Sequence, residues 1–305
     1  MTMTSALLDD AQAGDEHAFV ALIGPHRRAI EVHCYRMLGS IEDAEDAVQE
    51  VLVRAWRAVG RFERRASIGT WLYRIATNTC LDELDRRPRR PEPLVDPYPE
   101  ERLAEFAAEP LADPAARYAQ REGMELALLT AIQRLPGRQR AILILRDVLG
   151  WTAPETADLL DSTTAAVNSA LQRARITIDE QLPARSPTAA GPGDAALLRR
   201  YIDAWQRNDV DGLVALLRDD ATAIMPPRPD LLGARAIAEF FGTMDMRQQT
   251  LTPACANHQP AIAVRTHNPD GSSEPHRLLV LDVDDDRVAA LRVYFDRHVL
   301  ERCGV

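Results

Sequence analysis

The sequence predicts a multidomain protein in which two all-α domains are followed by an α+β domain. Its 305 residues suffice for two or three domains of about 100–200 residues each. Two proline-rich stretches, 87–114 and 183–193, divide the chain into three blocks. Apolar residues recur at helical spacing in the first two blocks. The third block mixes helical segments with Val-, Ile- and Leu-rich runs that are typical of strands.

The two proline-rich stretches are predicted to be linkers. The first holds seven prolines between residues 87 and 114 and cannot form one helix, and the second, PARSPTAAGPG, is expected to be flexible. The predicted organisation is a helical domain at 1–90, an acidic proline-rich linker at 91–114, a second helical domain at 115–182, a flexible linker at 183–193 and an α+β domain at 194–305.

The first block carries three helical signals. Apolar residues recur about every 3.6 positions from 15 to 38, which predicts one helix there. Ser40, followed by two acidic residues, is expected to cap the next helix. A third helix is expected from about Ser67. Its buried stripe has i, i+4 spacing and comprises Leu72, Ala76, Cys80 and Leu84.

The second block ends in a pattern with the spacing of a helix-turn-helix. Helices are expected at 124–135 and 138–149, a capping box at Thr152–Glu155, a short helix to about 160, a turn at 161–163 and a last helix at 164–178. In the last helix four short polar residues are predicted to reach base edges and two arginines to meet phosphates: Thr164, Asn168, Ser169, Gln172, Arg173 and Arg175. The alternative is a helical hairpin with solvated polar faces.

The third block is expected to hold helices at 195–207, 211–217 and 235–241. Strands are expected at 261–266, 277–282 and 288–295, with a turn at 268–271. Helices followed by an antiparallel meander favour an α+β fold.

Charge is distributed unevenly along the chain. The net charge of −10 argues by itself against binding nucleic acid, and all 36 basic residues are arginine, which indicates mainly a codon bias. Residues 54–90 nevertheless hold ten arginines against four acidic residues, whereas 94–125 hold eight acidic residues against three arginines. A local basic patch matters more for nucleic acid than the charge of the whole chain.

The sequence favours a cytoplasmic protein without a metal or another cofactor. It has no run of roughly 18 apolar residues, so we expect no membrane span, and its acidic start does not resemble a secretory signal. The four cysteines are widely separated and form no CxxC pair, which argues against a structural zinc site and against a disulfide framework.

Two further groups are candidate interfaces within the first block. One is the polar helix face formed by Asp46, Gln49, Glu50 and Arg54, for which a solvated face is the plainer interpretation. The other interleaves aromatic and cationic side chains, a mixture that suits splayed single-stranded bases. Its members are Phe62, Arg64, Arg65, Trp71, Arg74 and Asn78, and the alternative is that Trp71 belongs to the core.

These motifs resemble those of a known family. DAEDAVQEVLVRAW (43–56) and FERRASIGTWLYRIATNTCLDELDRR (62–87) resemble region two of bacterial sigma factors of the extracytoplasmic-function (ECF) class. AIQRLPGRQRAILILRDVLGWTAPETADLLDSTTAAVNSALQRAR (131–175) resembles region four of the same class. The two motif sets occur in the expected order and spacing.

The resemblance implies partners and roles. The polar face from Asp46 to Arg54 falls where the family contacts core RNA polymerase, and the group from Phe62 to Asn78 falls where it melts and reads the minus-ten promoter element. The polar residues from Thr164 to Gln172 fall on the minus-thirty-five recognition helix, beside the two arginines that suit backbone contacts. A sigma factor has no catalytic chemistry, so the expected function is promoter recognition and melting for transcription initiation.

The third block resembles a SnoaL-like domain, a cone of helices and a curved sheet around a pocket. The resemblance lies in 197–227, 231–241 and 278–296. It implies that the fused domain tunes sigma activity, in place of or beside a separate anti-sigma protein. Our hypothesis for the mechanism is intramolecular contact, in which this domain docks on the two sigma domains and holds them compact. A pocket for a small apolar ligand is one interpretation, and a packed core is the favoured one. The candidate lining residues are Tyr201, Trp205, Met225, Phe240 and Phe241.

The fold also hosts enzymes, but the sequence argues against catalysis here. Where the related ketosteroid isomerases place a carboxylate base before a proline, this chain has Met225, which cannot take a proton. His258, His267 and His276 are interpreted as loop or strand-surface residues. Two alternatives remain: a one-component DNA-binding regulator with a ligand-binding C-terminal domain, and an enzyme fused to a DNA-binding module.

Overall fold

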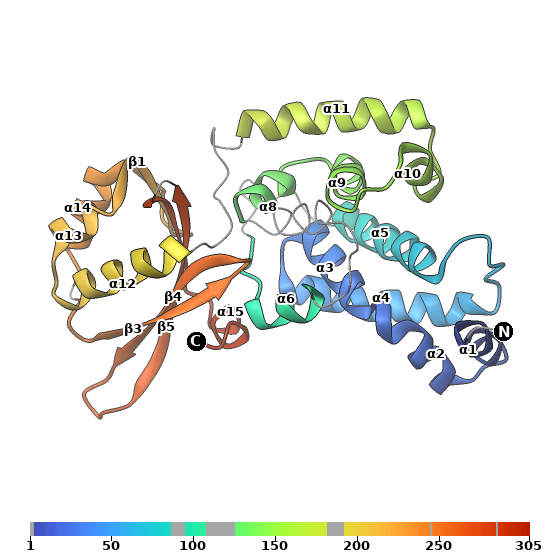
Figure 1. Cartoon of the computed structure of the whole chain (residues 1–305), viewed down its shortest axis with the longest axis horizontal. Coiled ribbons are helices and arrows are strands. Elements are labelled where there is room, and N and C mark those ends of the chain that lie inside the picture. The colour runs from blue at the N-terminus through green and yellow to red at the C-terminus, as the bar shows by residue number, and fades with distance from the viewer. Residues whose placement is uncertain (1–2, 87–94, 108–125, 182–191, 245, 285) are drawn as a thin grey trace. The chain divides into compact units, whose positions relative to one another are not determined.

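The computed structural model describes residues 3–86, 95–107, 126–181, 192–244, 246–284 and 286–305 (Figure 1). Of these, residues up to 95 and 129–181 form one compact unit, and residues 96–107, 126–128 and 192 onward form a second. Parts of both predicted linkers, 91–94, 108–114 and 183–191, lie outside the described residues.

The first half of the first unit is helical. Its elements are α1 (Met3–Gln12), α2 (Glu16–Ile23), a 3-10 turn (Gly24–His26), α3 (Arg27–Leu38), α4 (Ile41–Val59) and α5 (Ile68–Arg86). The single helix predicted at 15–38 is interrupted at Gly24, because Pro25 has no N–H to continue the helical ladder. Ser40 caps α4 as predicted, since its side chain accepts a hydrogen bond from the Asp43 N–H at 3.5 Å.

Helices α3, α4 and α5 bury a shared apolar core. Leu72, Ala76 and Cys80 of the predicted stripe are fully buried on α5, and Val51 and Ala55 of α4 are equally inaccessible. Packing of this kind, more than helix propensity, is what stabilises helices of this length.

The polar side chain of His33 on α3 is fully buried in this core, as is that of Thr77 on α5. His33 Nε2 lies 2.9 Å from the Thr77 hydroxyl oxygen. Burial, and then the charge of Arg36, lower the pKa of His33 from 6.5 to about 3. In the unfolded chain His33 therefore becomes protonated near pH 6.5, whereas in the folded chain it stays neutral down to about pH 3. Stability from this residue is complete above pH 6.5 and is lost as the pH falls through that window.

We expect the first unit to lose about 2 kcal/mol of unfolding free energy between pH 7 and pH 5 because of His33. Urea unfolding at both pH values measures the difference. His33→Gln should reduce the loss by that amount because glutamine does not titrate, whereas His17→Gln, at an exposed position, should leave it unchanged. A His33→Gln variant with the full pH dependence would contradict this account.

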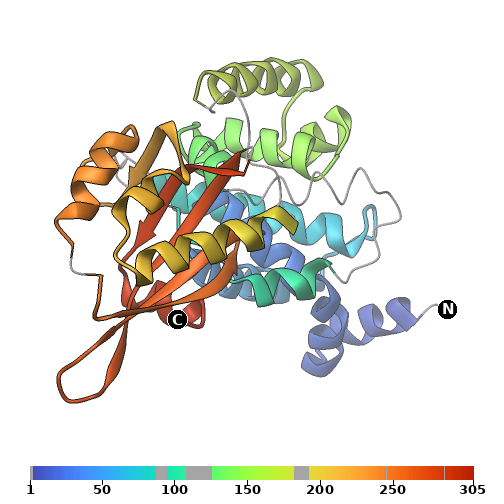
Figure 2. The same ribbon diagram turned by 60° about the vertical axis from the view of Figure 1, so that its left-hand side comes forward.

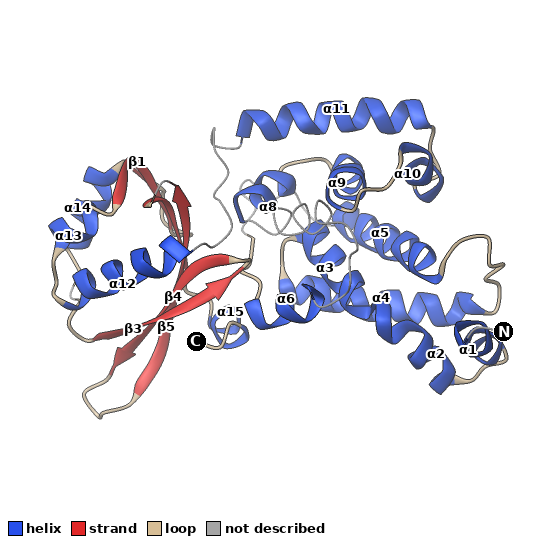
Figure 3. Ribbon diagram, viewed as in Figure 1, coloured by secondary structure: helices blue, strands red, loops and turns tan. Residues whose placement is uncertain are grey.

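The second half of the first unit is also helical (Figure 3). It comprises α8 (Leu126–Gln133), whose first three residues belong to the second unit, α9 (Gly137–Leu143), a short π-helix η2 (Ile144–Val148), α10 (Ala153–Leu159) and α11 (Thr164–Gln181). The predicted capping box is present: the Glu155 N–H donates to Thr152 Oγ1, and Glu155 Oε2 accepts from the Thr152 N–H at 2.7 Å.

Polar contacts join the two halves of the first unit. Arg140 of α9 is 5% exposed and donates to the carbonyl oxygens of Met37, Gln133 and Leu135. Gln133 Nε2 donates in turn to the Arg36 carbonyl oxygen at 2.9 Å. Because a buried guanidinium that loses its acceptors is costly, these bonds favour the packed arrangement.

The second unit is a six-stranded sheet with helices, and Figure 2 shows α12 lying across the curved sheet. The strand order is β2-β1-β6-β5-β4-β3, antiparallel except for the parallel pair β1 and β6. The strands are β1 (Leu217–Ile224), β2 (Leu231–Leu232), β3 (Gln249–Ala256), β4 (Gln259–His267), β5 (Ser273–Asp284) and β6 (Arg287–Tyr294). The helices are α6 (Glu100–Ala107), α12 (Pro192–Gln206), α13 (Val210–Val214), α14 (Ala234–Gly242) and α15 (Arg297–Arg302).

The predicted α+β fold is confirmed, with one correction and several additional elements, of which the helix α15 is one. The helix expected at 211–217 is too long, since α13 ends at Val214 and Leu217 begins β1. Strands β1, β2 and β3 are additional to those predicted. A short helix, α6, also lies in the stretch predicted to be a linker. No helix among the described residues is long and apolar enough to cross a membrane.

Candidate nucleic-acid interface

The helix-turn-helix is built by α10, a tight turn and α11. Asp161 adopts a left-handed backbone in the turn, with φ of 47°. Thr163 Oγ1 then caps α11 by accepting from the Ala166 N–H at 3.1 Å. Val167 and Leu171 of α11 and Ala157 of α10 are buried where the two helices pack together. The packing fixes which face of α11 remains exposed.

That exposed face carries the predicted DNA-reading residues. Thr164, Asn168, Ser169 and Gln172 are all exposed, as is Arg173. Arg175 is held differently: its Nε and Nη2 donate to the two carboxylate oxygens of Asp147 at 2.9 and 2.7 Å. A phosphate that binds Arg175 must therefore compete with this exposed ion pair, which is a weak one.

In the aromatic and cationic group at residues 62–78, the two aromatic rings are in contact, whereas the arginines pair with acidic residues. The Phe62 and Trp71 rings lie together with centroids 5.0 Å apart, and both are half-buried. Arg64 has a φ of 61° and pairs with Asp9, and Arg65 pairs with Glu63 at 2.8 Å.

Two further members of the group lie on α5. Asn78 is exposed. Arg74 instead contacts α10, pairing with the Asp158 carboxylate at 3.0 Å and donating to its carbonyl oxygen. Close by, the Tyr73 and Trp151 rings meet with centroids 5.6 Å apart. A residue predicted to bind DNA therefore ties α5 to the helix-turn-helix in this structure.

The polar face of α4 is exposed at Asp46, Gln49 and Glu50. Arg54 is less free, because it pairs with Glu50 at 2.7 Å and with Asp82 of α5 at 2.7 Å. Hydrogen bonds to Glu50 and then Asp82 raise the pKa of Arg54. Arg54 therefore links α4 to α5 and fixes the orientation of the polar face of α4.

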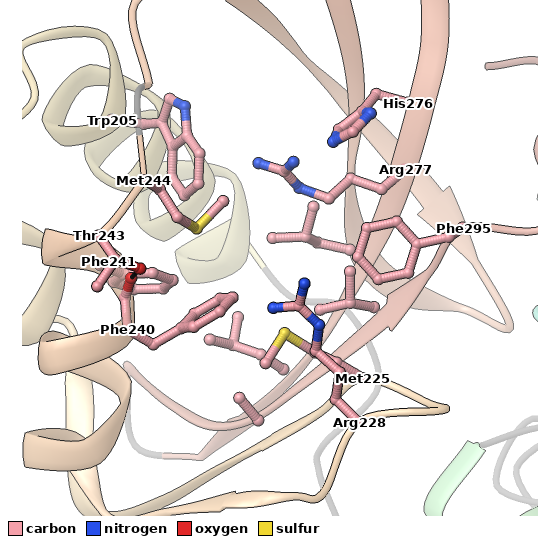
Figure 4. A pocket seen from close by; sticks show the side chains of 14 residues that line it. Trp205, Met225, Arg228, Phe240, Phe241, Thr243, Met244, His276, Arg277 and Phe295 are labelled. Carbon is pink, nitrogen blue, oxygen red and sulfur yellow. Dashed lines mark hydrogen bonds between the residues drawn. The ribbon is translucent and has the colours of Figure 1, made fainter.

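A pocket of about 370 Å³ lies in the second unit (Figure 4). Four of the five predicted residues line it: Trp205, Met225, Phe240 and Phe241. Tyr201 is fully buried and stacks on Trp205, with ring centroids 6.2 Å apart, but is not among the lining residues. Of the three histidines considered for catalysis, His276 lines the pocket.

Sequence reasoning missed two features of the second unit. Arg228 and Arg277 line the pocket, although 277–282 was recognised only as a strand. Asn257 and His258, both with left-handed backbones, form the turn between β3 and β4 and hold residues 98–100. No local sequence pattern predicts either feature, because both arise from contacts between residues that are far apart in the sequence.

Comparisons with known proteins agree with this architecture. Family models described as Sigma-70 region 2, Sigma-70 region 4 and SnoaL-like domain match residues 22–90, 125–178 and 198–291. The ECF RNA polymerase sigma factor SigG of Mycobacterium tuberculosis is 40% identical over 322 aligned residues, covering 97% of this chain and 85% of the relative. This chain belongs to the ECF class of sigma factors.

Other relatives of this sigma factor match in part or in fold. SigM of Mycobacterium tuberculosis is 36% identical over 53% of this chain and 76% of its own length. The crystal structure of Mycobacterium tuberculosis SigJ superposes with a TM-score of 0.65 at 21% identity, covering 93% of this chain and 98% of that one. All but the last three residues of the helix-turn-helix lie within the region 4 match, and the aromatic and cationic group lies within the region 2 match.

Proposed function

We propose that this sigma factor binds core RNA polymerase and directs promoter recognition and melting. The observation that carries the proposal is the exposed polar face of α11, held by a capped and tightly packed helix-turn-helix. In this proposal α11 reads the minus-thirty-five element, the group from Phe62 to Asn78 acts at the minus-ten element, and the polar face of α4 contacts polymerase. A reconstituted reaction with core polymerase tests it through promoter-specific transcripts.

Promoter binding in this proposal requires the first unit to open. The two promoter elements lie roughly 25 base pairs apart, or about 80 Å of B-form DNA. Arg74 cannot meet the minus-ten element while it pairs with Asp158, beside the helix that must reach the minus-thirty-five element. Core polymerase favours the open form if it binds that form more tightly. Joining two weak DNA readers on one enzyme then raises their effective concentration.

We infer that the SnoaL-like domain modulates activity by holding the chain between regions two and four. Asn257 is fully buried, its Oδ1 accepts from the Tyr98 N–H at 2.5 Å, and its own N–H donates to the Tyr98 carbonyl oxygen at 3.0 Å. Pro99 and Ala256 form a β-bridge. These bonds belong to the second unit and support a domain that restrains the inter-region segment.

A second set of contacts extends the restraint. Glu100 Oε2 accepts from the His258 N–H at 2.9 Å, and Glu100 Oε1 lies 2.7 Å from His258 Nδ1. Burial raises the pKa of Glu100, but its hydrogen bonds and charge interaction with His258 outweigh burial, so its net pKa is lowered. The carboxylate is therefore ionised and bonded at neutral pH.

The restraint is tested by Asn257→Gly. Glycine accepts the φ of 56° at this position, so the substitution removes mainly the side-chain oxygen that accepts from the buried Tyr98 N–H. We expect faster amide exchange over residues 96–107 and transcription shifted in the same direction as in a chain ending at residue 181.

Asn208→Gly is the matched control, since Asn208 has a φ of 55° and is exposed. It should leave both measurements unchanged. Faster exchange in Asn257→Gly with unaltered transcription on several promoters, or equal activity of the full and shortened chains, would contradict regulation by this domain.

The proposed role is not enzymatic. No Asp or Glu is among the residues that line the pocket, so the described lining offers no carboxylate base.

A further inference from the structure

The pocket of the SnoaL-like domain combines an apolar wall with two cationic groups. Trp205, Phe240, Phe241, Met225 and Leu279 contribute apolar surface. Figure 4 shows the guanidinium groups of Arg228 and Arg277 directed into the same space. Its volume of about 370 Å³ falls within the usual range for small-molecule sites.

Arg277 is a buried cation without an acidic partner. It is 3% exposed on β5, and its Nη2 donates to Oε1 of Gln249, a neutral amide, at 2.7 Å. Its guanidinium also lies 5.1 Å from the centre of the Trp205 ring. No carboxylate of the described residues forms an ion pair with it.

Burial lowers the pKa of Arg277 to about 10, so it stays charged at neutral pH. A buried charge is costly unless a counter-ion compensates it. An anion in the pocket would supply that missing compensation, and the planar guanidinium fork is suited to a carboxylate.

Arg228 provides a second cation at the rim. It is exposed and lies 5.7 Å from the centre of the Phe240 ring. No ion pair of Arg228 occurs within the described part of the chain. The pocket thus has positive groups from two separate segments and an apolar interior between them.

We propose that this pocket binds a small amphiphilic carboxylate. Arg277, helped by Arg228, holds the carboxylate, and the apolar body lies against Trp205, Phe240 and Met225. The SnoaL-like domain is then a sensor of organic acids as well as a restraint. Binding is measured on the full chain alone, so its failure is distinguishable from failure of the sigma function.

The test compares octanoate with 1-octanol, and 2-naphthoate with 2-naphthol, by calorimetry. Each pair shares an apolar body and differs in the charged head. We expect each carboxylate to bind at least tenfold more tightly than its neutral partner. Arg277→Gln should remove most of that preference while leaving the weak affinity for the alcohols unchanged.

Arg228→Gln is a second variant for the same binding measurement. Arg228 is exposed, so its replacement should not disturb folding. It should weaken carboxylate binding two- to fivefold. Arg265→Gln is the control, since Arg265 bonds Ser273 outside the pocket and should leave binding unchanged. Equal affinity for acid and alcohol, no saturable binding of either acid at millimolar concentration, or wild-type binding by both pocket variants would overturn the proposal.

Discussion

Replacing Asn168 and Gln172 of α11 with alanine should reduce promoter-specific transcription at least about tenfold. Both side chains are exposed and lie one helical turn apart on α11, and neither side chain forms a hydrogen bond within the described residues. The fold should therefore survive the change, and alanine favours a helix. A good base contact contributes about 1–3 kcal/mol of discrimination, so losing two should be plainly measurable.

The measurement is initiation by reconstituted polymerase on one mapped promoter. Glu180→Ala, at an exposed position near the end of the same helix, should behave as wild type. Core polymerase binding should stay unchanged in the double variant, which separates DNA reading from assembly. Undiminished transcription by the double variant would contradict the assignment of α11 as the recognition helix.

Reversing the charge of Asp46 should weaken binding of core polymerase at least about tenfold. Asp46 is exposed on α4, and its side chain forms no hydrogen bond or ion pair within the described residues, so Asp46→Arg removes no side-chain contact. A like charge introduced at an electrostatically complementary interface costs several kcal/mol. Affinity measured by fluorescence anisotropy with labelled protein gives the result directly.

Glu180→Arg is the matched control for that substitution, because it makes the same charge change at an exposed position of α11. Raising the salt concentration should reduce the difference in polymerase affinity between wild type and Asp46→Arg, because salt screens exposed charges. Equal polymerase affinity of Asp46→Arg and wild type would contradict the proposal that this face of α4 contacts polymerase.

Features that depend on short-range chemistry were predictable from the sequence. The cap at Ser40, the capping box at Thr152 and Glu155, and the turn before Thr164 each combine a polar side chain with nearby backbone groups. Family resemblance added the order of the sigma regions and the SnoaL-like domain.

Strands β1 and β3 were not predicted because their local sequences lack the pattern typical of a strand. β1 contains Asp219 and Asp220 at exposed positions, which hides its alternation. β3 contains Pro253, a residue that sheets tolerate at their edges, and β3 is an edge strand in this sheet. Their strand character comes from neighbours in the sheet, which the local pattern does not contain.

The contacts of Tyr98 and Arg277 could not be predicted for a related reason. Tyr98 bonds Asn257, which is 159 residues away, and Arg277 of β5 bonds Gln249 of β3, two strands away in the sheet. The continuous apolar run that follows Arg277 gives no sign that this arginine will itself be buried beside a cavity. Such features arise from tertiary packing alone.

Initiation from a genomic promoter library by core polymerase of a GC-rich bacterium tests the central claim most directly. The account predicts transcripts from a defined subset of promoters when this protein is added, and none from core polymerase alone. It also predicts that the same start sites persist when the chain ends at residue 181, with altered yield. No specific transcripts and no binding to core polymerase, with either length of chain, would contradict a sigma factor and favour a one-component regulator.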